Sequence, residues 1–441
     1  MLTRKSALFK AIGLLSLFPC ISHASSFQIL EQSPALMGQG FAGTASTAED
    51  ATTVFFNPAA LNQLDRSASV GINGIFTESK FRDTNSNTGG IPDKTDEVGV
   101  VPNLYAVFPY REGITFGFGV NAPFGLASKY DRNWIGRYLG TFSELEVINV
   151  SGAVALQLND QWAVGASANY QRADVTLESQ FDSTLGASPS PATDSRAKIA
   201  GDDDDFTATL ALFYTPTEDT KLGLVWHQGG KFDLTGDAKF DLNTACSPGA
   251  GYPTGAPPAP TTGTICNGLL NSLAGDVYAK VQLPDVMTFS ASQRVNDYWW
   301  LHLDVAWTEW SKIKQINIIH DDTNADVSTL DLQYQNSMRY AVGASYEAND
   351  QWTWRLGVAY DESPQEDPQH ITPRVPDDNR TWLTLGVNYA FSPSLSVDVS
   401  YAYLNVDEPK IQHFDPATGH NVEGTFKSKV SILGVQANWR F

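Results

Sequence analysis

The sequence predicts an all-β protein, a 14-stranded antiparallel transmembrane β-barrel with a small N-terminal hatch inside the lumen. Three observations support this fold class. Segments after residue 66 alternate apolar with small or polar residues, which is the pattern of a strand between lipid and lumen. Short turns and long polar loops follow one another in alternation along the chain. The last residue, Phe441, is an aromatic on the apolar face of the final segment.

The composition excludes other classes of protein. The chain has 441 residues and a formal net charge of -20, and 42% of its residues are hydrophobic. Beyond the N-terminus it contains no apolar run of about 18 residues, so a helical membrane protein is excluded. It shows no basic stripe, and a nucleic-acid partner is therefore not expected. An acidic surface suits long, hydrated external loops.

The first 24 residues form a predicted signal peptide. Basic residues precede an apolar stretch at 11–21, and small residues occupy Ser22 and Ala24, the positions recognised for cleavage. Export follows from this segment, and with the barrel pattern it predicts the bacterial outer membrane as the location.

The hatch is predicted at residues 25–66. Glycines and prolines interrupt every alternation of strand length in this stretch, which therefore cannot form part of the wall. We expect it to sit inside or below the barrel, whose predicted range is 67–441. The interrupting residues are Pro34, Gly38, Gly40, Gly43 and Pro58.

Several segments alternate cleanly enough to assign their faces. From Trp162, the even-numbered residues up to Tyr170 form the apolar face, and the odd-numbered residues up to Gln171 form the small or polar face. The same pattern recurs at 352–361, 383–391 and 395–403, with aromatic residues near the segment ends. Aromatic residues at these positions match the girdles of membrane barrels.

The connections set the number of strands. Six are short turns, and in three of them Asn-Asp-x-Trp places a tryptophan at the start of the next strand, at Trp162, Trp299 and Trp352. Seven are long and polar. Thirteen connections join fourteen strands, an even number that leaves both barrel ends on the periplasmic side. The short turns lie at 110–113, 159–160, 216–220, 296–297, 349–350 and 392–393, and the long loops at 80–99, 124–141, 180–202, 239–273, 311–333, 363–379 and 407–428.

The cysteines indicate one disulfide. After cleavage only Cys246 and Cys266 remain, both in one loop of an exported protein, where oxidising conditions favour a bond between them. A lipid anchor on Cys20 is the weaker alternative to plain cleavage, since Pro19 stands where a small residue should precede an acylated cysteine.

Scattered motifs resemble the FadL family of outer-membrane transport proteins for long-chain fatty acids. They span the mature chain from its start to its last strands. The matching stretches are Phe27-Gln28, Gly38-Gln39-Gly40, Asn57-Pro58-Ala59, 121–130, Leu283-Pro284, 307–311, 354–364 and 371–382.

The resemblance implies a lateral exit for a hydrophobic ligand. In that family the ligand is captured in an extracellular groove, passes to an inner pocket beside the N-terminus, here at Phe27, and leaves where the third strand kinks inward. The resemblance places the kink at Pro123, Phe124 and Gly125. This kink is expected to face Asn57, Pro58 and Ala59 of the hatch. Pro123 has no amide hydrogen to leave unpaired, Gly125 permits unusual backbone angles, and Asn57 offers a donor and an acceptor. The alternative is that Pro123 and Gly125 simply begin the following loop.

The ligand class stays open between two candidates. Fatty-acid members of the family bind the carboxylate with an Arg and a Lys, and the resemblance puts Leu177 and Gln335 at those positions. The nearby Arg172 and Arg339 match other arginines of the family, and Arg172 or Lys198 could take the place of the clamp. We expect passive uptake of long-chain fatty acids, with uncharged hydrocarbons, monoaromatics or alkanes, as the alternative.

No enzyme, cofactor or metal site is predicted. The sequence has no G-x-S-x-G, H-E-x-x-H or phosphate-loop motif. The Asp202 to Asp205 run is interpreted as a solvated loop edge, although carboxylates there could also bind a cation. A general porin is disfavoured by the hatch. The expected partners are the hydrophobic ligand, outer-membrane lipid and lipopolysaccharide, around a monomeric barrel.

Overall fold

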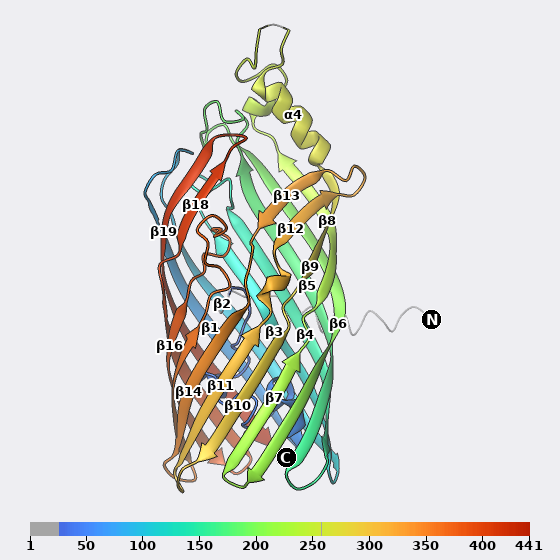
Figure 1. Cartoon of the computed structure of the whole chain (residues 1–441), viewed down its shortest axis with the longest axis vertical. Helices are drawn as coiled ribbons and strands as arrows, with labels where there is room; N and C mark the ends of the chain where they lie inside the picture. Colours follow the sequence, from blue (N-terminus) through green and yellow to red (C-terminus); the bar gives the residue numbers. More distant parts are fainter. Residues whose placement is uncertain (1–25, 257) are drawn as a thin grey trace, which may run out of the picture.

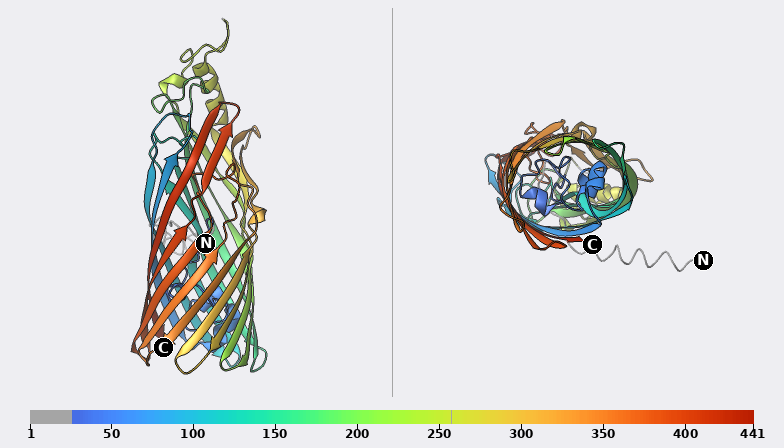
Figure 2. Two further views of the ribbon diagram at one scale, coloured as in Figure 1. Left: turned by 60° about the vertical axis from the view of Figure 1, so that its left-hand side comes forward. Right: turned by 90° about the horizontal axis from the view of Figure 1, so that it is seen from below.

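The fold is a single closed β-barrel. A computed structural model describes residues 26–256 and 258–441 and shows a 19-stranded antiparallel sheet. The sheet closes because the first strand, β1, pairs with the second, β2, on one edge and with the last, β19, on the other (Figures 1 and 2). The predicted signal peptide, residues 1–24, lies outside the described residues.

Fourteen crossings make the wall, as predicted. Two of them are interrupted: β7 continues into β8 after 228–230, and β9 continues into β10 after 283–285. The crossing strands are β1 (Ser67–Asp83), β2 (Lys94–Arg111), β3 (Ile114–Lys129), β4 (Phe142–Gln157), β5 (Trp162–Phe181), β6 (Ser195–Thr217), β7 (Thr220–His227) with β8 (Lys231–Asp241), β9 (Gly275–Gln282) with β10 (Val286–Arg294), β11 (Trp299–Thr308), β14 (Ser337–Glu347), β15 (Trp352–Asp361), β16 (Arg380–Ser392), β17 (Leu395–Val406) and β19 (His420–Arg440).

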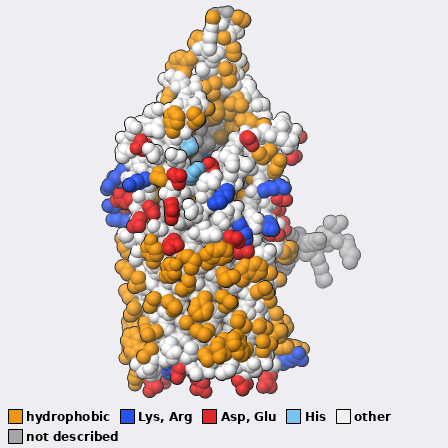
Figure 3. All heavy atoms as spheres, in the orientation of Figure 1, with side chains coloured by type: hydrophobic (Ala, Val, Ile, Leu, Met, Phe, Trp, Pro, Cys, Tyr) orange, Lys and Arg blue, Asp and Glu red, His pale blue; other side chains and the backbone are white. Residues whose placement is uncertain are grey.

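The outer face carries a band of hydrophobic side chains. The band crosses the lower half of the molecule in Figure 3, with charged residues gathered above it and a rim of mainly acidic residues, together with some basic ones, below it. Outward residues such as Leu356, Val358 and Leu385 are about half exposed, while their neighbours along the strands are buried in the lumen. This alternation is the one that the sequence predicts for lipid-facing strands.

Above the band the strands continue further than predicted. The prediction assigns 80–99 and 407–428 to loops, but β1 reaches Asp83, β2 begins at Lys94 and β19 begins at His420. The Asp202 to Asp205 run likewise lies within β6 and not at a loop edge. The reason is physical: outside lipid the outward residues turn polar, so hydrophobic alternation ends while backbone pairing goes on.

The remaining elements lie at the long-loop end. Strands β12 (Gln315–His320) and β13 (Asp326–Asp331) form a hairpin, η3 (Trp310–Lys312) precedes it, and β18 (Lys410–Asp415) pairs with β19. The projecting loop at the top of Figure 1 holds η2 (Thr244–Cys246) and α4 (Thr262–Leu273). The predicted disulfide between Cys246 and Cys266 joins them, with the two Cα atoms 5.2 Å apart. No helix among the described residues is long and apolar enough to cross a membrane.

The N-terminal segment, defined here as residues 26–66, lies inside the barrel. Its ribbon fills part of the ring seen from below in Figure 2. It contains α2 (Pro34–Met37), α3 (Thr53–Phe56) and η1 (Pro58–Gln63), all short because prolines and glycines interrupt them. Met37, Phe41 and Leu61 are fully buried, so the segment packs tightly against the inner wall.

Candidate functional site

The wall is interrupted between β2 and β3. The ladder between these strands stops at the pair Leu104 and Val120, whereas the ladder from β3 to β4 continues to Lys129. The β3–β4 register also shifts between Asn121 and Phe124. Every residue from Asn121 to Ser128 is buried, so this part of β3 presents no face to lipid. The strand has moved into the lumen.

The N-terminal segment takes the place that β2 leaves. Gln28 forms an isolated antiparallel bridge with Phe124. The Ile29 amide donates to the Pro123 carbonyl at 2.8 Å, and the Gly125 amide donates to the Phe27 carbonyl at 2.9 Å. Buried backbone groups must find such partners, because an unpaired one within the membrane costs several kcal/mol. Residues 27–29 therefore close the interruption from inside.

The side chain of Asn57 hydrogen-bonds within the N-terminal segment and to β6, and not to the displaced strand. Its Oδ1 accepts from the Ala59 amide at 2.9 Å, and its Nδ2 donates to the carbonyls of Ala45 and Leu212. Pro58 and Ala59 lie directly over Gly165 of β5. The chain folds this way because Asn caps the η1 helix while Pro suits its first turn. The motif thus anchors the segment to β5 and β6.

A lower pocket lies behind the displaced strand. Its cavity volume is about 80 Å³, of the same order as a cavity that holds an aromatic ring. The aromatics Phe55 and Phe56, which precede Asn57, do line it together with Pro123 and Phe124. Its far wall is polar, with Ser167, Asn169, Thr207, Thr209, Asp304, Arg339 and Asp361 among the lining residues.

An upper pocket lies nearer the long loops. Its cavity volume is about 120 Å³ and its lining is almost entirely apolar. Phe27 lines it, and the Phe27 ring contacts Trp310 at 4.8 Å and Phe124 at 6.3 Å between centroids. Phe27 lines the upper pocket and Phe124 lines the lower one. The rings of Phe27, Phe124 and Trp310 therefore lie between the two pockets. Other lining residues are Leu126, Leu145, Val147, Val175, Leu177, Ile199, Phe232, Leu234, Ile316, Leu330 and Leu332.

The structure places the four predicted ligand-pocket residues other than Phe27 in different parts of the molecule. Leu177 faces the upper pocket, as an inner-pocket residue should. Gln335 is exposed in a separate polar hollow, beside Lys314 and His370. The structure therefore brings only the first of these two together with Phe27.

The two predicted arginines also lie apart. Arg172 is on the outer face of β5, where it pairs with Asp174 at 3.3 Å and Asp202 at 2.8 Å, so its placement in the pocket is wrong. Arg339 lines the lower pocket, donates to the Gly40 carbonyl and lies 3.9 Å from Asp304.

Sequence reasoning missed the loop between β15 and β16. Residues 362–379 fold back into the barrel, and Thr372, Arg374 and Val375 line the upper pocket. The Tyr130 hydroxyl donates to the Pro373 carbonyl at 3.0 Å and so holds this loop against the end of β3. A polar loop without periodicity gave no signal for this placement.

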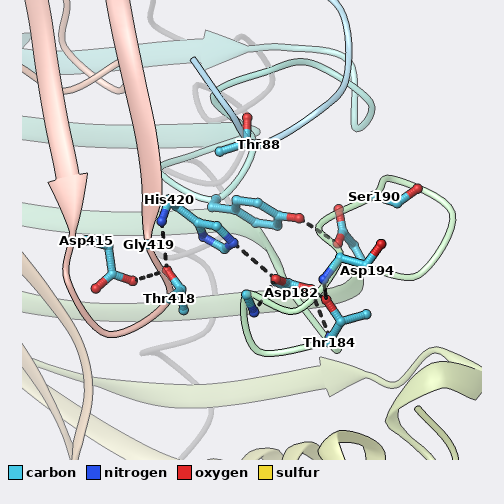
Figure 4. Close-up of polar contacts among 12 residues, drawn as sticks. Thr88, Asp182, Thr184, Ser190, Asp194, Asp415, Thr418, Gly419 and His420 are labelled. Atoms are coloured by element: carbon cyan, nitrogen blue, oxygen red, sulfur yellow. Dashed lines mark hydrogen bonds and ion pairs between the residues drawn. The ribbon is translucent and has the colours of Figure 1, made fainter. Parts of the chain in front are cut away.

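Polar contacts join the long loops to one another (Figure 4). His420 lies 3.0 Å from Asp182, and Arg137 and Tyr138 both donate to Asp194, at 2.5 and 2.9 Å. Burial alone would raise the pKa of the Asp182 carboxyl, but hydrogen bonds from His420 and Thr184 hold it below its usual value. Asp182 is therefore ionised at neutral pH and ties these loops together.

Comparisons with known proteins place this geometry among membrane transporters. Residues 15–441 match the family model described as outer membrane protein transport protein (OMPP1/FadL/TodX). The long-chain fatty acid transport protein of Escherichia coli K12 is 28% identical, over 99% of this chain and 98% of that protein. The 47 kDa outer membrane protein of Pasteurella multocida is 27% identical, over 95% and 94%.

Solved structures share the fold. A crystal structure of a Pseudomonas aeruginosa FadL homologue has a TM-score of 0.82 at 22% identity, covering 94% of this chain and 100% of that one. The Pseudomonas putida toluene transporter TodX has a TM-score of 0.68 at 18% identity, covering 95% and 100%. At these identities both similarities show the fold alone.

Proposed function

Because the chain belongs to the OMPP1/FadL/TodX family of outer membrane transport proteins, we propose that it takes up long-chain fatty acids passively. The family consists of transport channels, so the chain is a transporter of the outer membrane and not an enzyme. In the proposed route the ligand is captured at the long-loop end, binds in the upper pocket and leaves sideways between β2 and β3. Residues 26–66 act as the hatch.

The interruption of the β2–β3 ladder carries this proposal. Val98 and Leu104, on the outer face of β2 beside the interruption, are both exposed and belong to the hydrophobic band. The interruption therefore lies at the level of the lipid chains. Pro123 and Phe124 on the displaced strand line the lower pocket, so movement of this wall would connect that pocket with lipid.

A sideways exit suits the physical chemistry of the ligand. Each buried methylene is worth about 0.8 kcal/mol, so moving a long acyl chain into water costs on the order of 10 kcal/mol. Release from a lumen pocket directly into hydrocarbon avoids most of that cost. The route needs no energy source, since the ligand only moves between apolar surroundings.

Relatives support two ligand classes. The Escherichia coli relative is named for long-chain fatty acids, whereas solved structures of similar fold include toluene transporters from Ralstonia pickettii and Pseudomonas putida. Fatty acids come first because the chain aligns with the fatty-acid protein at higher identity. Uncharged hydrocarbons are the second candidate, since Leu177 faces an almost wholly apolar pocket.

We also propose that lipopolysaccharide contacts the outer face of the barrel above the hydrophobic band. There Lys80, Lys94 and Lys427 stand side by side on β1, β2 and β19. Such a row suits the phosphate groups of this lipid. The barrel closes on itself through the pairing of β1 with β19, which is consistent with a monomer.

Uptake in cells that lack other carriers tests the ligand class. We expect expression of the chain to produce saturable uptake of labelled oleate that excess toluene does not inhibit. Saturable toluene uptake without any oleate uptake would contradict the fatty-acid proposal and favour the hydrocarbon alternative. A matched strain that expresses an unrelated porin controls for leakage of the membrane.

A further inference from the structure

Arg374 is a buried arginine without a carboxylate partner. Five arginines of the described chain are buried: Arg137, Arg339, Arg355, Arg374 and Arg380. Four of them lie beside an acid. The pairs are Arg137 with Asp194, Arg339 with Asp304, Arg355 with Asp398, and Arg380 with Asp377. Arg374, which is 7% exposed, forms no ion pair with any described residue.

The contacts that Arg374 does make are neutral. Its Nη1 donates to the Phe142 carbonyl at 2.9 Å and to the Ser143 hydroxyl at 2.8 Å. Its side chain packs over Gly140, where no side chain displaces it. Burial lowers the pKa of this guanidinium to about 10, so it remains charged at neutral pH. A buried charge without an opposite charge is costly, and such groups are normally paired.

The position of Arg374 suggests where the opposite charge comes from. It lines the upper pocket, whose other walls are mainly Leu, Val, Ile and Phe side chains. Glu144, an acidic residue that also lines this pocket, forms no ion pair with it. An apolar pocket with one arginine at its wall matches a molecule that has an apolar chain and one anionic end.

We propose that Arg374 binds the carboxylate of a fatty acid whose chain occupies the upper pocket, and thereby selects carboxylates over uncharged hydrocarbons. The proposal rests on the uptake function above and specifies its ligand. The planar guanidinium can donate two parallel hydrogen bonds to a carboxylate, and no donor from Arg374 other than Nη1 is taken by a described residue. In this arrangement Leu177 contacts the chain of the ligand and not its charged end.

Paired ligands separate the charge from the chain. We would measure equilibrium binding of labelled oleate and of oleyl alcohol, which has the same chain and no charge, to the purified barrel in detergent. The wild type should prefer oleate. Arg374→Met should weaken oleate binding about 10- to 100-fold, as expected for a charge-assisted hydrogen bond, and leave oleyl alcohol binding within twofold. Arg374→Lys should restore part of the preference.

Arg172→Met is the matched control, because Arg172 lies on the outer face and should change neither affinity. Undiminished oleate binding by Arg374→Met would overturn the role of Arg374 and leave the proposed uptake standing. An equal loss of affinity for oleate and for oleyl alcohol would also overturn the role of Arg374, because such a loss would show that Arg374 only supports the loop. A wild type that binds neither ligand would instead contradict the proposed function itself.

Discussion

At the scale of single residues, Asn57 shows how one side chain can replace several backbone partners. It is fully buried, caps η1 and bonds to carbonyls in two other parts of the chain. Asn57→Ala should therefore lower the stability of the folded barrel by about 1–3 kcal/mol, through loss of the cap and of buried hydrogen bonds. Thermal unfolding of the purified barrel in detergent measures this.

Asn62→Ala is the control for that substitution. Asn62 lies in the same short helix but makes one long hydrogen bond, at 3.4 Å to the Gly113 carbonyl. Its replacement should have a clearly smaller effect. Equal effects of the two substitutions would mean that the partners of Asn57 contribute little.

The side of the wall that each strand residue faces was partly predictable from the sequence. Arg172 shows where this prediction failed. The alternation from Trp162 puts even-numbered residues on the outside, and Arg172 continues that series, so its outward position follows from the sequence. The similarity to arginines of the family suggested that Arg172 lies in the pocket. A shift of the strand by one residue, however, moves every side chain to the opposite face. Arg374 could not be found this way, because no periodicity governs a loop that folds back into the lumen.

At the scale of elements, the fit between η1 and the wall depends on one glycine. A Cβ on Gly165 would lie 2.3 Å from the Ala59 nitrogen and 2.4 Å from the Pro58 carbonyl carbon, both backbone atoms that cannot rotate away. Gly165→Ala should therefore displace η1 and cost about 1–3 kcal/mol. Protease sensitivity of residues 26–66 and thermal unfolding would report the displacement.

Gly152→Ala provides the matched comparison on the neighbouring strand β4. A Cβ there would have no atom within 4 Å, so we expect a change within about 0.5 kcal/mol. If Gly165→Ala were as harmless as Gly152→Ala, the tight packing of the motif against β5 would be contradicted.

The number of strands was predictable, but their lengths were not. Membrane strands reveal themselves through alternation and tight turns, which is why fourteen crossings follow from the sequence. Once β6 leaves the lipid, its outward residues Asp202 and Asp204 resemble those of a loop although the strand continues. The inward shift of β3 left a trace in Pro123 and Gly125, whereas nothing in the sequence predicted that Gln28 would pair with Phe124.

At the scale of the whole molecule, the barrel combines a closed wall with one built-in interruption beside two pockets. The N-terminal segment closes that interruption by backbone bonds from residues 27–29, which can be released without unfolding any strand of the wall. A fixed plug would be compatible with the same contacts. The central claim is therefore that the segment must leave β3 for the ligand to pass.

A reversible cross-link tests this claim most directly. Gln28 and Phe124 face each other as a pair that shares no hydrogen bond, flanked by the bonds from Ile29 to Pro123 and from Gly125 to Phe27. Such pairs bring their Cα atoms to about 4.5 Å, within the range of a disulfide. Gln28→Cys combined with Phe124→Cys should thus fix the segment to β3 under oxidising conditions. The single cysteine variants, and the wild type with and without reductant, control for the native disulfide and for loss of the Phe124 ring.

The measurement is oleate uptake by cells that carry the double variant, before and after mild reduction. We predict that the oxidised form binds oleate but does not transport it, and that reduction restores uptake to the level of the single variants. Unchanged uptake by the fully cross-linked protein would contradict the lateral route past β3.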